Sequence, residues 1–381
     1  MSHRIRRVQQ LRVAPTPLVG LFGLFAERLE VRTNDRRILA AAEASFGRFE
    51  VPSSGEPLVV RLVVDDPVAP SPAAPAAPLD ARSLGHETAG DLFSISLGSA
   101  GRAVVDLATG FGTGSVTPAL AEEAGLLRYA FVEAMPLAML TGGRGYVAIH
   151  ASCVVRDGIG VILQAPAGTG KSTLALACAR RGWGLLAEDV VFARPIDGHG
   201  SDSPLEVWGM PWTQRLMPDA PRFFPELASA AVRLQANGEQ KLEIDLDDHA
   251  PGTATPRAAA GPIALLARDT GGLTRAEWLA PDDDPAEVEV LWPWEAGWTP
   301  AHERTGSTSW RSTSTSMPPG RPRPAPPPAR SSSFPPEPLQ AVAASATVSS
   351  PARAARLRKM FISVLSSPRC DIETRLARDV T

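Results

Sequence analysis

The segment from Ala165 to Ser172 has the residue types and spacing of a phosphate-binding loop. It follows the pattern G-x-x-x-x-G-K-[ST], except that alanine stands at the first glycine. Glycines let consecutive backbone N–H groups point at phosphate oxygens, lysine reaches the outer phosphates, and serine can bind Mg²⁺. Without its context, such a run could also be a glycine-rich turn between a strand and a helix. We predict an ATP site formed by Ala165, Pro166, Ala167, Gly168, Thr169, Gly170, Lys171, Ser172 and Thr173.

Two adjacent acids, Glu188 and Asp189, follow an apolar run downstream of this loop. An acid that ends a strand beside a phosphate loop typically holds Mg²⁺. Neighbouring side chains of an extended segment diverge, so one acid can serve the metal while the other accepts a proton from a hydroxyl group. We therefore predict Ser172, Glu188 and Asp189 as metal ligands, and Asp189 also as the catalytic base. The alternative is a solvated acidic pair at a strand end.

His150 and Glu206 each occur within an apolar, strand-like run. Taken alone, a histidine in such a place is more often structural than catalytic, and Glu206 would be unremarkable. His150 and Glu206 become candidate site residues only through their positions relative to the loop and the acidic pair.

Together these residues resemble the catalytic domain of HPr kinase/phosphorylase, the bacterial serine kinase of the sugar-transport phosphocarrier. The resemblance covers about residues 146–246 and implies an α/β P-loop kinase domain of the HPr kinase/PEP carboxykinase-like type. It implies catalytic roles for four residues: Asp189, His150, Lys171 and Glu206. The segments that carry it are His150-Ala-Ser, Gly158 to Gln164, Ala165 to Ser172, Leu174 to Gly182, Leu185 to Asp189, and Leu205-Glu206-Val-Trp-Gly209.

The chain also departs from the family pattern. Ala165 replaces the first loop glycine, Glu188 stands where the family usually has Asp, and the segment Trp208 to Trp212 replaces a glycine-rich stretch. In these respects the chain is more similar to divergent HPr-kinase-related proteins, whose relatives include kinases of ribosomal-peptide precursors.

The reaction expected from this resemblance needs ATP and Mg²⁺ and transfers the γ-phosphoryl group to a serine or other hydroxyl of a protein or peptide. Three alternatives remain open: an ATP-binding regulatory protein that has lost catalysis, an ATPase, and a kinase of small metabolites.

The elements that must position these residues alternate between strands and a helix. A helix from Lys171 to Arg181, ended by Gly182, separates strands that suggest the opening of a parallel α/β unit. A further strand at Gln240 to Asp245 fits an edge position, with Lys241 as a candidate cationic contact. Three strands are predicted nearer the loop: one that contains the runs Tyr146 to His150 and Cys153 to Val155, a second at Gly160 to Gln164, and a third at Leu185 to Phe192.

We predict that residues 1–144 form an N-terminal α/β region of unassigned role and that residues 145–296 form the catalytic domain. The region contains a helix from Asp35 to Phe46 and a long helix from Pro118 to Leu140 that Pro136 would kink. A hairpin is predicted from Leu92 to Leu97 and from Arg102 to Leu107. A Pro/Ala-rich loop occupies residues 66–79, because so many prolines leave too few N–H donors for a packed element.

The composition changes abruptly after residue 297. Proline, serine and arginine dominate residues 297–352, which predicts disorder because little apolar area is available to bury. Residues 353–381 form a tail in which an amphipathic segment near Leu357 to Leu365 predicts a short helix. The same change motivates the hypothesis that this end is an out-of-frame reading.

The bulk composition excludes several classes of protein. The 381 residues are 44% hydrophobic and 21% charged with a net charge of -3, which gives no reason to expect nucleic acid or a membrane as a partner. Cys153, Cys178 and Cys370 have no disulfide or zinc spacing. No signal peptide is visible, so a cytoplasmic protein is expected. The expected partner is the protein or peptide substrate, and the resemblance also suggests a homo-oligomer.

Overall fold

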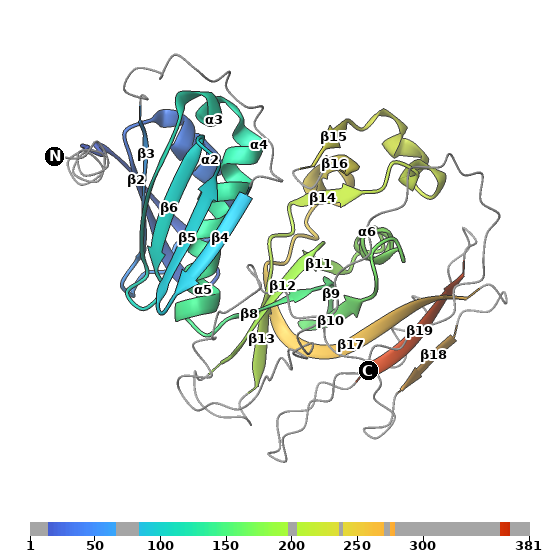
Figure 1. Cartoon of the computed structure of the whole chain (residues 1–381). Coiled ribbons are helices and arrows are strands. Elements are labelled where there is room, and N and C mark those ends of the chain that lie inside the picture. The colour runs from blue at the N-terminus through green and yellow to red at the C-terminus, as the bar shows by residue number, and fades with distance from the viewer. Residues whose placement is uncertain are drawn as a thin grey trace, which may run out of the picture.

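The computed structural model describes residues 14–65, 84–196, 204–235, 239–269, 275–278 and 359–365, and its side chains as far as residue 267. Over these ranges the chain is an α/β protein with one seven-stranded, one nine-stranded and one three-stranded sheet (Figure 1). Within the same ranges, no helix is long and apolar enough to cross a membrane. The loop predicted at residues 66–79 and the disorder predicted at 297–352 lie outside the described residues.

The seven-stranded sheet is built from the N-terminal region in the order β1-β2-β3-β7-β6-β5-β4. Its neighbours pair antiparallel except for β2 with β3 and β3 with β7, which are parallel. The predicted hairpin is confirmed as β5 and β6, which pair from Leu92 with Asp106 to Leu97 with Gly101. The strands are β1 (Leu18–Leu24), β2 (Glu27–Thr33), β3 (Leu58–Val64), β4 (Leu84–Ala89), β5 (Leu92–Leu97), β6 (Gly101–Asp106) and β7 (Phe111–Val116).

The helices of this region share one buried core with the sheet. The helix predicted from Asp35 is confirmed as α2 (Arg36–Phe46). The single long helix predicted from Pro118 is wrong, because the non-helical backbone of Glu123 interrupts it. The segment is instead divided into α3 (Pro118–Glu122), α4 (Ala124–Leu127), the π-helix η2 (Arg128–Glu133) and α5 (Ala134–Gly143). Pro136 has no N–H for a bond to the preceding turn, and the wider π-helical turn lies directly before it.

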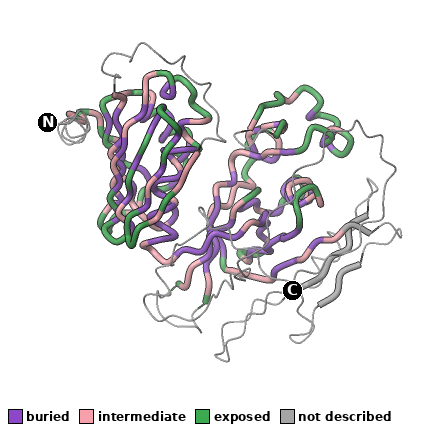
Figure 2. The backbone as a smooth tube through the Cα atoms, in the orientation of Figure 1, coloured by how far each residue is buried: buried purple, intermediate pink, exposed green. Residues whose placement is uncertain are grey.

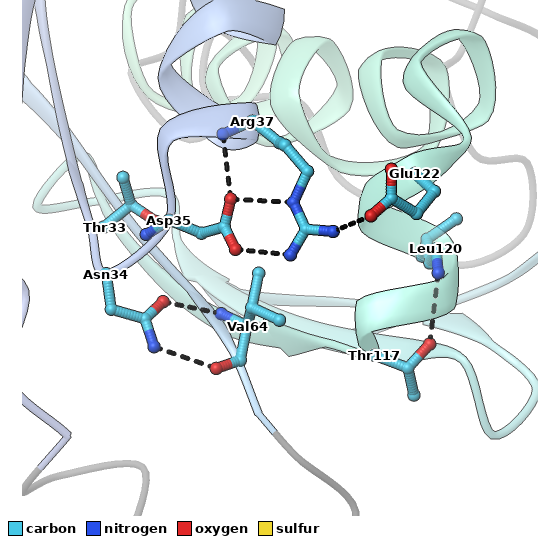
Figure 3. Close-up of polar contacts among 8 residues, drawn as sticks. All are labelled: Thr33, Asn34, Asp35, Arg37, Val64, Thr117, Leu120 and Glu122. Atoms are coloured by element: carbon cyan, nitrogen blue, oxygen red, sulfur yellow. Dashed lines mark hydrogen bonds and ion pairs between the residues drawn. The ribbon is translucent and has the colours of Figure 1, made fainter.

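Side-chain caps fix the start of α2 and α3 beside the end of β3 (Figure 3). Asp35 accepts a hydrogen bond from the Arg37 backbone N–H at 2.8 Å, and the Arg37 guanidinium also pairs with Glu122 of α3. The amide of Asn34 donates to the Val64 carbonyl at 2.9 Å and accepts from the Val64 N–H at 2.8 Å. Asp35 satisfies a backbone donor that α2 itself leaves open, and the Arg37–Glu122 pair joins α2 to α3. The Asn34 bonds hold the segment before α2 to the end of β3.

The nine-stranded sheet contains the candidate site. Its main path runs β11-β9-β10-β17-β13-β12-β8, and β19 pairs with both β17 and β18. Helix α6 (Lys171–Ala179) follows β10 and packs against it and its neighbours through the buried side chains Val161, Leu174 and Leu185. The strands are β8 (Val147–His150), β9 (Ser152–Arg156), β10 (Ile159–Gln164), β11 (Gly184–Ala187), β12 (Val190–Pro195), β13 (Leu205–Trp208), β17 (Arg257–Asp269), β18 (Arg275–Trp278) and β19 (Lys359–Leu365).

Two expectations for this sheet are corrected. Strands β10 and β11 are not adjacent, because β9 lies between them and pairs antiparallel with both. The sheet is therefore mixed rather than the opening of a simple parallel unit. The short helix predicted near Leu357 is also wrong, since Lys359–Leu365 forms β19, which lies parallel to β17. Phe361, Ile362 and Val364 favour a strand where a partner strand satisfies the backbone.

The three-stranded sheet has the order β14 (Thr213–Leu216), β16 (Gln240–Asp245) and β15 (Val232–Leu234). Strand β16 is therefore central, not the edge strand that the sequence suggested. Leu216, Leu242 and Ile244 are buried in the same cluster as the helix residue Leu174, so this sheet packs over α6 (Figure 1). The short helices η3 (Ala220–Arg222), η4 (Pro225–Ser229) and α7 (Leu246–His249) complete this part of the chain.

Aromatic rings join the N-terminal region to the nine-stranded sheet. The ring of Phe25 lies 5.0 Å from Phe192 and 5.8 Å from Trp208, centroid to centroid. Phe49 makes an edge contact with Trp212 at 4.7 Å. Trp208 is buried, and Met210 and Trp212 pack against the same core, so the segment that departs from the family pattern supplies surface at this junction. Buried residues follow the strands of both sheets along the backbone, as the purple tube shows (Figure 2).

Candidate functional site

The phosphate-loop segment connects β10 to α6. Gly168 and Gly170 have φ angles of 78° and 115°, which only glycine adopts without strain. No other atom lies within 4 Å of where a Cβ would stand at either position, so the requirement is conformational rather than steric. The Thr169 N–H donates to the Pro166 carbonyl at 3.3 Å, and the Leu174 N–H donates to Gly170 at 2.9 Å in the first helical turn. The loop therefore presents the N-terminal end of α6, where backbone N–H groups favour an anion.

Lys171 is the first residue of α6 and is only 8% exposed. Its ammonium group donates to the carbonyl oxygen of Ala165, 2.6 Å away across the loop. The Ala165 side chain is itself buried with Leu163 and Leu174. The methyl group at the altered glycine position thus packs in the core, while its carbonyl contacts the lysine.

The acidic pair lies at a bend between two strands, and the continuous strand predicted from Leu185 to Phe192 is wrong. The chain changes its partner at this point, because β11 pairs with β9 whereas β12 pairs with β8. The Ala151 N–H donates to the Asp189 carbonyl at 3.1 Å, and the Ser152 hydroxyl donates to the Glu188 carbonyl. The link between β8 and β9 therefore fixes the backbone of both acids.

The two acidic side chains have different surroundings. Glu188 is 5% exposed, and its Oε1 atom accepts a hydrogen bond from the Ser172 hydroxyl at 2.6 Å. The Asp189 side chain is 56% exposed, and its Oδ1 atom lies 3.2 Å from Nε2 of His150. The structure thus brings Ser172 to one acid and His150 to the other.

These surroundings move the two pKa values in opposite directions. Burial, together with the neighbouring Asp189 carboxylate, raises the pKa of Glu188 from 4.5 to about 7. The hydrogen bond from His150 is the main cause that lowers the pKa of Asp189, and the charges of Lys241 and Lys171 act in the same direction. Near neutral pH, Asp189 is therefore charged whereas Glu188 readily exchanges a proton.

The oxygen atoms at this point fit a magnesium ion only together with a nucleotide. Among the described residues, no group of three or more His, Cys, Asp or Glu side chains could hold a metal by itself. The Ser172 hydroxyl and the Glu188 carboxylate are in contact, and Asp189 is the next residue. Mg²⁺ in proteins is commonly held by one or two carboxylates plus substrate phosphates, so this set is sufficient when phosphate oxygens complete it.

The raised pKa of Glu188 predicts how stability depends on pH. A carboxyl group that is more basic in the folded state favours folding at low pH, and this advantage is lost as pH rises from about 4.5 through about 7. In nucleotide-free protein at pH 8, Glu188→Gln should therefore raise the free energy of unfolding by up to about 3 kcal/mol. The gain should shrink towards pH 5. Urea unfolding of the wild type and of Glu188→Gln between pH 5 and pH 8 measures this gain in unfolding free energy, and Glu56→Gln, at an exposed site, is the control. A gain that does not change with pH would contradict the prediction.

Glu206 does not join the acidic pair. Glu206 lies on β13 opposite Arg194 of β12. Arg194 is four residues along β12 from Val190, the residue after Asp189, so the two positions are about 13 Å apart along the strand. Its buried carboxylate pairs with the guanidinium of Arg257, which stacks over Trp208 at 4.9 Å. The structure thus gives Glu206 a charge partner of its own, apart from the acidic pair, and the catalytic role predicted for it stays a prediction.

Comparison with known proteins leaves the family open. No protein-family model and no curated protein matches the chain. Among solved structures it is similar to the HPr(Ser) kinase/phosphatase from Coxiella burnetii, with 20% sequence identity and a TM-score of 0.21. The match covers 34% of this chain and 70% of that chain. Similarity at this level gives no basis for assigning an activity.

Two contributions to the site had no clear sequence signal. Ala151 and Ser152 hold the acidic pair through its main-chain carbonyl groups, and no residue-type pattern marks such contacts. Arg215 comes from β14 of the small sheet, and its charge acts on Glu188 together with that of Lys241. Lys241 is recognisable as a cation in the sequence, but its place in the fold is not, because the pairing of β16 with β14 and β15 is not local.

Proposed function

We propose that the chain is an ATP- and Mg²⁺-dependent kinase that transfers the γ-phosphoryl group to a serine or other hydroxyl of a protein or peptide. In this proposal the nine-stranded sheet with α6 is a P-loop kinase domain of the HPr-kinase-like type. One observation carries it: the first turn of α6 directs Ser172 to Glu188, with 2.6 Å between their oxygen atoms, while the charge of Lys171 acts on Asp189.

The start of α6 supplies what a triphosphate needs. The loop amides and the helix end attract anionic oxygens, and Lys171 adds an ammonium group that is nearly buried. The ammonium group donates to the uncharged Ala165 carbonyl, and a phosphate oxygen would be a stronger acceptor because it carries charge. When bound, Mg²⁺ would be held by Ser172 and Glu188 and would neutralise phosphate charge.

Asp189 is suited to accept the proton of the attacking hydroxyl. It is charged near neutral pH, its side chain reaches solvent, and His150 fixes one of its oxygens. As the acceptor oxygen forms its bond to the γ-phosphorus, the bond from that phosphorus to the bridging oxygen breaks and ADP leaves. The hydroxyl proton passes to the Asp189 carboxylate, so atoms and charges balance.

The exposure of Asp189 also favours a second candidate, an ATPase, because water could take the place of the hydroxyl. The test is to incubate the purified full chain with Mg²⁺ and ATP labelled at the γ-phosphate, with and without a library of serine-containing peptides. Labelled peptide is the expected result. Release of labelled inorganic phosphate without peptide labelling would support the ATPase, and ATP binding without either product would support a regulatory protein that has lost catalysis.

A further inference from the structure

The seven-stranded sheet has helices on one face and exposed apolar side chains on the other. Helices α2 and α5 contact its strands, and the side chains directed towards them, such as Leu29, Val60 and Val105, are buried. Side chains alternate between the two faces along a strand. The residues between these buried positions therefore form a second face, which we call the open face. Its exposed large apolar residues are Val19, Leu21, Leu92, Val104 and Phe111.

The pairing register brings these side chains together on one surface. Val59 lies beside Phe111, and both Phe111 and Leu92 lie opposite Asp106. Val104 is two residues before Asp106 and so shares its face. The five exposed apolar residues are 41% to 58% accessible, so covering the open face would bury a substantial apolar area. Such a group on one face typically marks a surface that another segment or molecule covers.

The chain itself crosses the open face before it enters β1. Arg61 of β3 alternates with the buried Val60 and Leu62, so its side chain lies on the open face. Its guanidinium donates a hydrogen bond to the Ala14 carbonyl. Strand β1 begins at Leu18 and is an edge strand two positions from β3, which is about 10 Å. Four residues span up to about 14 Å, so the chain passes over β2 between β3 and this edge.

Residues 1–13 therefore join the described chain at a point above the open face. Beyond β3 the sheet continues through β7, β6, β5 and β4, which span about 19 Å. Thirteen residues reach about 20 Å even with the short rise of an α-helix, and further when extended. The segment contains the apolar residues Ile5, Val8, Leu11 and Val13. It thus has both the length and the side chains to cover the exposed apolar group.

We propose that residues 1–13 dock on the open face and cover its exposed apolar side chains. The occupant is then part of the same chain, and the contact of Ala14 with Arg61 is the beginning of that docking. Because the segment is tied to the face, its effective concentration there is far above that of a separate molecule, and few apolar contacts suffice to hold it. This inference is independent of the proposed function, since the open face and the phosphate loop belong to different sheets.

Cross-linking of introduced cysteines tests the position of the segment. In the full chain with Cys370→Ser, Val8→Cys is combined either with Val104→Cys or, as the control, with Ala40→Cys. Ala40 is exposed on α2, at the face that the helices cover, and the two other native cysteines are buried. A short bismaleimide should join position 8 to position 104 within one chain, and it should leave the control pair unjoined.

Two further variants test whether apolar contacts hold the segment. Ile5→Asp combined with Leu11→Asp should slow formation of this cross-link about tenfold or more, because burial of each such side chain contributes a factor of about ten. Gln9→Asp combined with Gln10→Asp adds the same charge to the segment at polar positions. The rate of cross-linking in that variant should equal the rate without it.

The outcomes separate the possible occupants of the open face. Mixing chains of two isotope compositions shows by mass whether a link lies within one chain or between two. A link between two chains would assign the face to a second copy and overturn the inference. Failure to form the link to Val104→Cys, equal linking to Ala40→Cys, or an equal effect of the two Asp pairs would overturn it as well. Thermal unfolding of each variant shows whether a lost link comes from loss of the fold.

Discussion

Lys171→Ala is expected to lower ATP turnover by a factor of about 10²–10³ while the protein stays folded. The lysine is the one cation that the loop itself contributes, and its ammonium group is held 2.6 Å from the Ala165 carbonyl at the start of α6. Removing it leaves the loop amides without the charge that stabilises the outer phosphates. The measurement is the steady-state rate of ADP formation with saturating Mg²⁺ and the best peptide acceptor found.

Arg180→Ala provides the matched control. It removes a positive charge from the opposite end of the same helix, about 13 Å from Lys171, where the guanidinium pairs with Glu226. That variant should keep the wild-type turnover. The melting temperature of Lys171→Ala should remain within a few degrees of the wild type, because the loop conformation depends on Gly168 and Gly170. Undiminished turnover in Lys171→Ala would remove the basis of the assignment to a P-loop enzyme.

The elements that sequence reasoning placed correctly are those with local signals. The helix at Arg36–Phe46 has an Asp cap and a periodic apolar face, and the hairpin of β5 and β6 has glycines in its turn. Strand β10 and helix α6 flank the loop as expected. In each case the residues that determine the element lie within a few positions of it, so one sequence is enough.

The errors share a non-local cause. The apolar run from Leu185 to Phe192 predicts one strand. In the structure it is divided at Glu188 and Asp189, because its first half pairs with β9 and its second half pairs with β8. The insertion of β9 between β10 and β11, and the pairing of β19 with β17, also depend on segments far apart in the chain. Hydrophobic patterning specifies which face of a strand is buried, not which strand lies beside it.

The site shows the same division between local and distant information. Ser172 and Glu188 were predicted to share a metal because an acid that ends a strand beside a phosphate loop typically holds Mg²⁺, and the structure brings their side chains into contact. Glu206 was assigned by resemblance, yet its pairing with Arg257 follows from the register of β13 with β17, which the sequence does not reveal. The departures at Ala165 and at Trp208 to Trp212 become intelligible only in three dimensions, where each packs in a core.

Asp189→Asn is expected to lower phosphoryl transfer by a factor of about 10²–10⁴ while leaving the affinity for the Mg²⁺–ATP complex within about twofold. Asparagine preserves the size of the side chain and an oxygen that can accept from His150, but it cannot take a proton from a hydroxyl. The structure favours Asp189 over Glu188 for this step, because Glu188 is buried and already accepts from Ser172. Single-turnover transfer to peptide measures the rate, and calorimetry with a non-hydrolysable analogue measures binding.

Glu188→Gln separates the two roles. Because Glu188 is the acid in contact with Ser172, its loss should weaken the binding of Mg²⁺ with nucleotide, whereas the loss of Asp189 should spare it. The opposite pattern, with weak nucleotide binding in Asp189→Asn and a slow chemical step in Glu188→Gln, would exchange the assignments. The bend holds the two carboxylates in different surroundings. Glu188 is buried beside the helix start with a pKa of about 7, whereas Asp189 is exposed and charged. The two acids lie where the chain changes strand partners from β9 to β8, and their different surroundings suit one to binding and the other to proton transfer.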